Sequence, residues 1–384
     1  MAHSAKLKGV DLLGTGDFTH PLWFKTLARQ LSPLGNGFYG CDDTLFVITT
    51  EVSAIWRQDG TVRKVHLIVL APSLKAAAAI GRELAGVGKL ASDGRPTLKA
   101  SAQDLVGTII SASDKAMVIP AHVWTPWFSV FGSNSGFDSI DECFGVCSSS
   151  ICAIETGLSS DPPMNRRISA LDRFVLVSNS DAHSPRTIGR EATLFELSEL
   201  TYSCLISALG RRGPSRVRGT LEFYPEEGKY YYDGHRKCGV VLSPKEAIEM
   251  GNRCPVCGKP LTIGVMHRIE SLADRNESGG GSDIPRYTHL LPLTEIIAQA
   301  LGVRSTAKGV AREYDRLVGY FGSELRLLLE VPIAELKETV PRRICEGIVR
   351  VRDEDLFIQP GYDGVYGEVT IPFKEPGDGN VAIS

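Results

Sequence analysis

An aspartate and a histidine at positions 181 and 183 are the clearest candidates for chemistry in this sequence. They follow the apolar run Phe174-Val-Leu-Val, which is typical of a buried strand. At the mouth of such a strand a carboxylate oxygen and an imidazole nitrogen can turn toward one point, and Zn²⁺, Mn²⁺ and Fe²⁺ accept such ligands. The alternative is a loop in which Asp181 caps a helix and His183 is a solvated surface residue.

Similar residues recur at the ends of other expected strands. The candidate metal ligands are Asp17, His20, Glu51, His66, His122, Glu155, Asp181 and His183. Taken alone, His66 on its apolar strand is more often a satisfied core residue than a ligand. However, several carboxylates and imidazoles pointing into one cavity would be costly to bury unpaired, and bound cations remove that cost. The pattern therefore favours a polynuclear metal centre.

Such a centre indicates a reaction class. Closely spaced metal ions lower the pKa of water and stabilise the attacking and leaving oxygens of a phosphoryl transfer. Hydrolysis of a phosphoester is thus the favoured reaction. Glu51 is the natural bridging carboxylate, and Asp181 is the best candidate to position the nucleophile, which makes these two the predicted catalytic residues.

A second metal signature lies further along the chain. His235-x-x-Cys238 is followed by Cys254-Pro-Val-Cys257-Gly258, and a Cys-x-x-Cys turn lets two thiolates bind one ion. Four ligands would close one structural zinc site. His267 is an alternative to His235 as the histidine ligand, and we favour His235 because it is close to Cys238. Cys143, Cys147 and Cys152 are better explained as small buried thiols.

Several aromatic and basic residues could contact nucleic acid. The predicted DNA-binding residues are Trp124, Trp127, Arg166, Arg167, Arg211 and Arg212. The arginines could neutralise phosphates, and the tryptophans, which follow His122, could stack on an unstacked base. The alternatives are a solvated arginine face and a hydrophobic lid.

The elements that must position these residues alternate along the first half of the chain. Strands are expected at residues 9–16, 45–49, 64–70, 116–120, 153–156 and 174–177, and helices at 21–31, 73–84 and 101–112. This alternation favours a parallel α/β domain, most simply a barrel. We expect domains at 1–222, 223–275 and 276–384. The last would comprise a flexible link at 276–282, helices over 290–349 and a flexible tail after Lys374.

Composition fits a soluble globular protein. The 384 residues are 43% hydrophobic and 23% charged. The net charge of −3 argues against a surface coated in positive charge but leaves room for a local basic groove. There is no apolar run of membrane-spanning length, and the first residues lack the apolar core of a signal peptide. We therefore expect a cytoplasmic location and reduced cysteines.

The motifs together resemble the PHP phosphoesterase superfamily. The resemblance rests on Gly14-Thr-Gly-Asp-Phe-Thr-His-Pro21, Glu51, Lys64-x-His-Leu67, Pro120-Ala-His-x-Trp124, Glu155 and Ser180-Asp-Ala-His-Ser184. Tyr232-Asp-Gly-His-Arg-Lys-Cys-Gly239, Cys254-Pro-Val-Cys-Gly258 and the segment at 264–275 resemble the endonuclease Q family specifically. The likeness covers residues 5–275 firmly and the C-terminal part loosely.

The resemblance implies a fold and an activity. It implies a distorted (β/α)7 barrel with about two to three divalent ions, Zn²⁺, Mn²⁺ or Mg²⁺. It also implies cleavage of DNA on the 5′ side of uracil, hypoxanthine, xanthine or an abasic site, in DNA repair. DNA is the expected partner, with replication or repair clamp proteins as further candidates. A PHP-type phosphoesterase acting on a small phosphate ester and a catalytically impaired DNA-binding homologue are the alternatives.

The sequence departs from this family at one place. PHP proteins open with a His-x-His pair on their first barrel strand, whereas here His3 stands alone. Either the start has been misassigned, or the protein lacks its first strand and two metal ligands. The barrel is therefore expected to lack its first strand.

Overall fold

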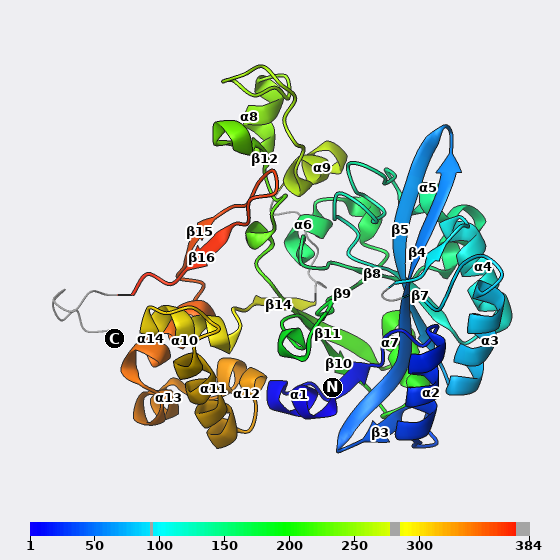
Figure 1. The fold of residues 1–384 in the computed structure, drawn as a ribbon, viewed down its shortest axis with the longest axis horizontal. Coiled ribbons are helices and arrows are strands. Elements are labelled where there is room, and N and C mark those ends of the chain that lie inside the picture. The colour runs from blue at the N-terminus through cyan, green and yellow to red at the C-terminus, as the bar shows by residue number, and fades with distance from the viewer. Residues whose placement is uncertain (93–94, 277–284, 374–384) are drawn as a thin grey trace.

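The computed structural model describes residues 1–92, 95–276 and 285–373, and its central element is a long antiparallel hairpin (Figure 1). The hairpin consists of β4 (Thr44–Gln58) and β5 (Thr61–Ala71). Asp59 and Gly60 connect the strands with φ angles of 51° and 78°, as a type I′ turn requires. Glu51 and His66 therefore lie within paired strands rather than at strand ends, because they are opposite Ile68 and Ser53.

The hairpin belongs to a seven-stranded sheet with the order β2–β3–β4–β5–β7, in which β1 and β6 also pair with β4. Its other strands are β1 (Leu12–Gly14), β2 (Ser32–Pro33), β3 (Tyr39–Cys41), β6 (Thr97–Leu98) and β7 (Met117–Pro120). Only β1 and β6 run parallel to β4 in this sheet, whereas β5 pairs antiparallel with both β4 and β7. The expectation of a parallel α/β arrangement is therefore wrong for the β4–β5–β7 part of this sheet. A two-residue turn can join only antiparallel strands, since a parallel pair needs a crossover connection.

Helices pack beside the hairpin and bury the main core (Figure 1). Ser73 and Ser101 cap α3 (Leu74–Leu84) and α4 (Ala102–Ala112) by accepting hydrogen bonds from backbone N–H groups. The other helices of this part are α1 (Ala2–Lys8), α2 (Pro21–Gln30), α5 (Ile140–Phe144) and η1 (Gly145–Ser150). The predicted helices at 21–31, 73–84 and 101–112 are confirmed.

Smaller sheets follow the first one along the chain. β8 (Ala153–Glu155) is parallel to β9 (Val175–Val177), and these are the predicted strands at 153–156 and 174–177. In a third sheet β11 (Arg216–Glu222) pairs with β10 (Ala192–Glu196) and with β14 (Arg286–His289). The helical segments here are α6 (Pro162–Arg166), η2 (Ser169–Leu171), η3 (Pro185–Thr187), α7 (Tyr202–Leu209) and η4 (Pro225–Glu227).

The cysteine-containing segment forms a small unit at the top of the view in Figure 1. It consists of β12 (Asp233–His235), η5 (Arg236–Cys238), β13 (Val240–Leu242), α8 (Pro244–Glu249) and α9 (Val265–Leu272). Ala247, Cys254 and Leu261 form its own apolar cluster. Val265 and Ile269 of α9 instead pack into the main core, which anchors the unit to the rest of the protein.

The C-terminal part is helical, as predicted for residues 290–349, and has its own core (Figure 1). Its elements are α10 (Leu293–Leu301), α11 (Lys308–Phe321), α12 (Glu324–Leu329), α13 (Ile333–Thr339), α14 (Arg342–Arg352), β15 (Phe357–Gln359) and β16 (Glu368–Thr370). The predicted link at 276–282 falls outside the described residues except for Asn276, and so does the predicted tail beyond residue 373. Among the described residues, no helix combines the length and apolarity needed to span a membrane.

Candidate metal centre

Three of the predicted ligands meet on the hairpin and on the segment after β7. Glu51 Oε1 lies 3.1 Å from His66 Nδ1 and 3.3 Å from His122 Nε2, and those two nitrogens are 3.0 Å apart. One ligand atom from each of the three residues lies within 4.8 Å of the other two. A carboxylate oxygen and two imidazole nitrogens at this spacing are a donor set that divalent transition metals accept. These residues therefore fit a metal ion.

The backbone around His122 is built to present its imidazole. His122 has a φ of 31°, and a Cβ on Gly157 would lie 2.5 Å from the Cβ of His122, so that close approach requires glycine. The His122 backbone N–H donates to Glu155 Oε2 at 2.7 Å, and Nδ1 lies 3.0 Å from Thr125 Oγ1. With Nδ1 and the backbone held, Nε2 faces Glu51.

Glu155 lies behind His122 and is buried, with 3% of its surface exposed. Its second oxygen accepts a hydrogen bond from Asn179 Nδ2 at 2.8 Å. Burial raises the pKa of Glu155 to about 7, although the charge of His122 opposes this. Glu155 is thus linked to the centre by its hydrogen bond with the backbone N–H of His122.

Asp181 is joined to the centre through an arginine. Arg95 Nη2 lies 2.9 Å from Asp181 Oδ1, and Arg95 Nε lies 2.8 Å from Glu51 Oε2. Asp181 has a φ of 42°, a strained value of the kind that accumulates at functional sites. His183 lies further out: its side chain is 75% exposed, and its Nδ1 lies 2.9 Å from the carbonyl oxygen of Asp181.

Asp17 and His20 border the centre from the loop after β1. Thr15 and Thr49 tie that loop to β4, because Thr15 Oγ1 accepts from the Thr49 N–H and Thr49 Oγ1 accepts from the Gly16 N–H, both at 2.9 Å. His20 caps α2 with Nδ1, which accepts from the Trp23 N–H at 3.4 Å and leaves Nε2 for another partner. Partial burial and the charge of Glu51 raise the pKa of Asp17. The Asp17 carboxyl is therefore close enough to Glu51 for their charges to interact.

The pKa shifts of Glu51 and His66 favour the charge states that metal ligands need, whereas that of His122 favours the protonated form. Burial would raise the pKa of Glu51, but hydrogen bonds with His122 and His66 and the charges of His122 and Arg95 hold it well below its usual range. Burial lowers the pKa of His66, which keeps this imidazole neutral and its lone pair available. Burial acts in the same direction on His122, but the hydrogen bond and charge of Glu51 outweigh it and raise its pKa.

The structure therefore brings some of the predicted ligands into contact and leaves others, such as His183, apart. Glu51, His66 and His122 are in direct contact, and Asp181 joins them through Arg95. Arg95 was not predicted, because one arginine in a polar loop has no periodicity or spacing that marks it. Its contacts arise only in the folded protein, where β4, β5 and the loop of Asp181 lie close together.

The cysteine unit brings four further donors together. His235, Cys238, Cys254 and Cys257 each place a ligand atom within 4.8 Å of the others, and Cys257 Sγ lies 3.5 Å from His235 Nδ1. His267 is not a member of this group, and its Nδ1 lies 2.6 Å from Asp233 Oδ2. The geometry therefore favours His235 over His267 as the histidine of this group.

The predicted DNA-binding residues divide into buried and exposed ones. Trp124 is 1% exposed and donates from Nε1 to Asn165 Oδ1, and Arg166 is 6% exposed and bonds to the Leu171 carbonyl oxygen. The prediction that these two contact DNA is wrong, because both side chains lie inside the protein. Arg167 pairs with Glu270 at 2.6 Å.

Three members of the predicted set are exposed. Trp127 is 41% exposed and makes an edge contact with Tyr230. Arg211 and Arg212 are exposed as well, although Arg211 also donates to the carbonyl oxygens of Asp172 and Phe174.

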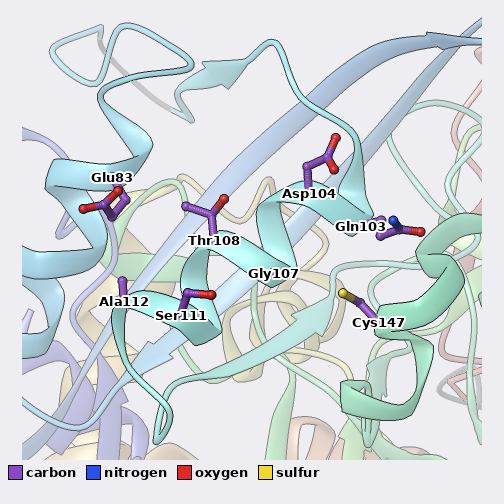
Figure 2. A pocket seen from close by; sticks show the side chains of 8 residues that line it. All are labelled: Glu83, Gln103, Asp104, Gly107, Thr108, Ser111, Ala112 and Cys147. Carbon is purple, nitrogen blue, oxygen red and sulfur yellow. The ribbon is translucent and has the colours of Figure 1, made fainter.

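A cavity of about 550 Å³ lies away from the centre, between α3, α4 and η1 (Figure 2). Figure 2 shows Glu83 at the left of the view and Asp104 and Cys147 toward the right. None of the predicted ligands lines it, so it does not form part of the candidate metal centre.

Comparison with known proteins gives both sequence and structural relatives. The family described as the MJ0043 C-terminal domain matches residues 292–355. Protein MJ0043 of Methanocaldococcus jannaschii is 30% identical over 254 residues, which are 64% of this chain and 31% of that protein. This chain thus spans about a third of MJ0043. Protein YqxK of Bacillus subtilis is 27% identical over 381 residues, which are 96% of this chain and 91% of YqxK.

Two solved structures are similar over nearly the whole chain. The lesion-specific endonuclease PfuEndoQ from Pyrococcus furiosus has a TM-score of 0.85 and 31% identity, covering 97% of this chain and 89% of that one. Endonuclease Q in complex with a 27-mer duplex that carries an abasic lesion at the active site has a TM-score of 0.84 and 32% identity, covering 97% and 90%.

Proposed function

The chain belongs to the endonuclease Q family, and we propose that it is a metal-dependent DNA endonuclease acting at damaged nucleotides. It hydrolyses the phosphodiester on the 5′ side of a deaminated base (uracil, hypoxanthine or xanthine) or of an abasic site. The observation that carries this proposal is the contact among Glu51, His66 and His122, with Asp181 next to them. An abasic lesion in the active site of a similar structure supports the substrate class.

Metal ions would be held by the residues around the hairpin. The proposed ligands are Asp17, His20, Glu51, His66, His122, Glu155, Asp181 and His183, with Glu51 as the bridging carboxylate. When bound, divalent ions acidify water and neutralise charge on the phosphate. The neutral His66 and ionised Glu51 are in the charge states such ligands need.

Asp181 has the position of a proton acceptor in this reaction. Its carboxylate is 31% exposed, whereas Glu51 is 20% and His66 8% exposed, so it borders the open side of the centre. A carboxylate there can orient the attacking water and accept its proton. Glu155 and Thr125 hold His122 in place and do not need to touch DNA.

DNA would approach across the exposed residues near the centre. Trp127 follows His122 by a few residues, and Thr125 Oγ1 donates to the Trp127 carbonyl oxygen at 2.9 Å. The exposed indole can stack on a base at the lesion, and Arg211 and Arg212 can neutralise phosphates further away.

We also propose a division of the chain into three parts and a structural zinc site in the second part. Residues 1–222 form the PHP-type barrel, residues 223–275 the zinc unit and residues 276–384 the C-terminal part. His235, Cys238, Cys254 and Cys257 hold one structural Zn²⁺, because four thiol and imidazole donors match a closed tetrahedral site.

The test is a nicking assay on end-labelled duplexes that carry uracil, hypoxanthine or an abasic site, with an undamaged duplex as control. Wild-type protein should cut 5′ to the lesion, and the Asp181→Asn variant should lose at least about a thousandfold in rate while keeping its fold by circular dichroism. Full-rate cutting by Asp181→Asn would refute the role of Asp181. Equal cutting of undamaged duplex would refute lesion specificity.

A further inference from the structure

The guanidinium of Arg95 lies inside the candidate metal centre and touches three proposed ligands. Its Nε is 2.8 Å from Glu51 Oε2, its Nη2 is 2.9 Å from Asp181 Oδ1, and its Nη1 is 3.2 Å from His66 Nδ1. The Arg95 side chain is 26% exposed, so this is not a solvated surface pair. A positive charge therefore lies between the two carboxylates that a divalent ion would bind.

These contacts use the atoms that metal binding needs. Arg95 cannot give up its charge, because a guanidinium stays protonated in proteins. The guanidinium lies beside His66 Nδ1, the nitrogen that also faces Glu51 Oε1, and so occupies the space that a metal bound to this nitrogen would need. Arg95 and a divalent ion that binds Glu51, His66 and Asp181 through these atoms thus exclude each other.

A displaced guanidinium would remain close to the reacting group. The planar fork of arginine matches two oxygens of a phosphate as well as it matches a carboxylate. Within the described residues, Arg95 is the arginine that contacts Glu51 and Asp181 directly, so it is the nearest permanent cation to these carboxylates. Once metal ions neutralise Glu51 and Asp181, a DNA phosphate at the centre is the next anion within its reach.

We propose that Arg95 competes with divalent metal for Glu51, His66 and Asp181, and that it binds the substrate phosphate when metal holds these residues. This inference rests on the proposed function, since it assumes that metal and DNA meet at this centre. It assigns Arg95 two measurable effects, a weakening of metal binding and a strengthening of DNA binding.

The experiment measures both effects on the full chain with Arg95→Ala and Arg95→Gln, which remove the charge with and without the side-chain length. Mn²⁺ affinity is measured without DNA by competition with a chelating dye. The DNA concentration that gives half-maximal nicking is measured at saturating Mn²⁺. Arg82→Ala is the matched control, because Arg82 is exposed on α3.

Both Arg95 variants should bind Mn²⁺ about tenfold more tightly than wild type and need about tenfold more DNA for half-maximal nicking, since each loses charge-assisted hydrogen bonds to an anion. Arg82→Ala should change neither quantity. Unchanged or weaker Mn²⁺ binding would overturn the proposal, as would an unchanged DNA requirement. If wild type cuts none of the lesion duplexes, the proposed function fails, whereas the Mn²⁺ titration still decides whether Arg95 competes with metal.

Discussion

At the scale of single residues, the fold also buries two carboxylates that are not proposed metal ligands. Glu191 and Glu222 are 1% and 0% exposed, and each has one oxygen without a hydrogen-bond partner among the described residues. Burial raises the pKa of Glu222 to about 8, although a hydrogen bond from Thr156 opposes this. The pKa of Glu191 is raised as well, first by burial and then by the charge of Glu222. Ionising this pair inside the fold is therefore costly.

This pair predicts a pH-dependent stability. Because folding raises the pKa of Glu222 from 4.5 to about 8, its protonated form stabilises the fold below pH 4.5, and this contribution is lost as the pH rises toward 8. Glu222→Gln cannot ionise, so it should exceed wild type by roughly 1–3 kcal/mol in unfolding free energy at pH 9 and by much less at pH 5. Urea denaturation at both pH values measures this difference.

The exposed Glu199 supplies the control, since Glu199→Gln removes the same charge from the surface. Its unfolding free energy should differ from wild type by the same small amount at both pH values. A Glu222→Gln variant that behaved like this control would show that Glu222 ionises freely in the folded protein.

Residue types and apolar runs were enough to predict that Glu51, His66 and His122 lie close together. His66 and His122 stand next to apolar strands, where an unpaired imidazole would be costly, so a shared partner was expected. Burial of individual side chains could not be predicted in the same way. Trp124 and Arg166 look identical in sequence to exposed DNA-binding residues, but one fills the core and the other bonds to nearby backbone.

At the scale of elements, the β4–β5 hairpin sets the relative positions of Glu51 and His66. It places Glu51 and His66 on adjacent antiparallel strands, whereas the sequence was interpreted as parallel strands joined by helices. Asp59-Gly60 between two apolar runs is a strong hairpin signal and would have predicted the reversal. The strands themselves were predicted because apolar runs are local, whereas their pairing depends on the turn and on long-range contacts.

At the element scale we also expect the stability of the cysteine unit to depend on bound metal. Its own apolar cluster is small, with Ala247, Cys254 and Leu261, so bound zinc should contribute much of its stability. Burial alone would raise the pKa of the Cys254 thiol, but backbone N–H groups of Cys257 and Val256 help lower it to about 7, which favours the thiolate that zinc binds.

Cys257→Ser should therefore lose the bound zinc and speed amide hydrogen exchange at least about tenfold over residues 233–262, because a ligand is removed while the main core is untouched. Exchange in α3 and α4 should stay unchanged. Cys147→Ser, in the cavity beside α4, is the matched thiol control. Slow exchange in a zinc-free Cys257→Ser unit would contradict a structural metal site.

At the scale of the whole molecule, the described residues form four apolar clusters, and contacts between distant segments join them (Figure 1). β14 pairs with β11, and Lys8 of α1 lies 2.5 Å from Glu324 of α12, so the N-terminal and C-terminal parts are in contact. These pairings connect residues far apart in the sequence and have no local signal, which explains why the helices were predicted but their packing was not. The candidate metal centre thus lies on the first sheet, and the cysteine unit projects at the top of the view in Figure 1.

The central claim is that imidazole and carboxylate ligands bind divalent ions that are required for cutting DNA. Metal should be removed from wild-type protein with a chelator, and nicking of an abasic-site duplex should be measured as Mn²⁺ is added back, with His122→Ala in parallel. We expect no nicking by the stripped protein, recovery of wild type on Mn²⁺ addition, and at least a hundredfold lower recovered rate for His122→Ala, on the order expected for loss of a functional ligand. Full nicking by the metal-free protein, or equal recovery of the His122→Ala variant, would contradict this account.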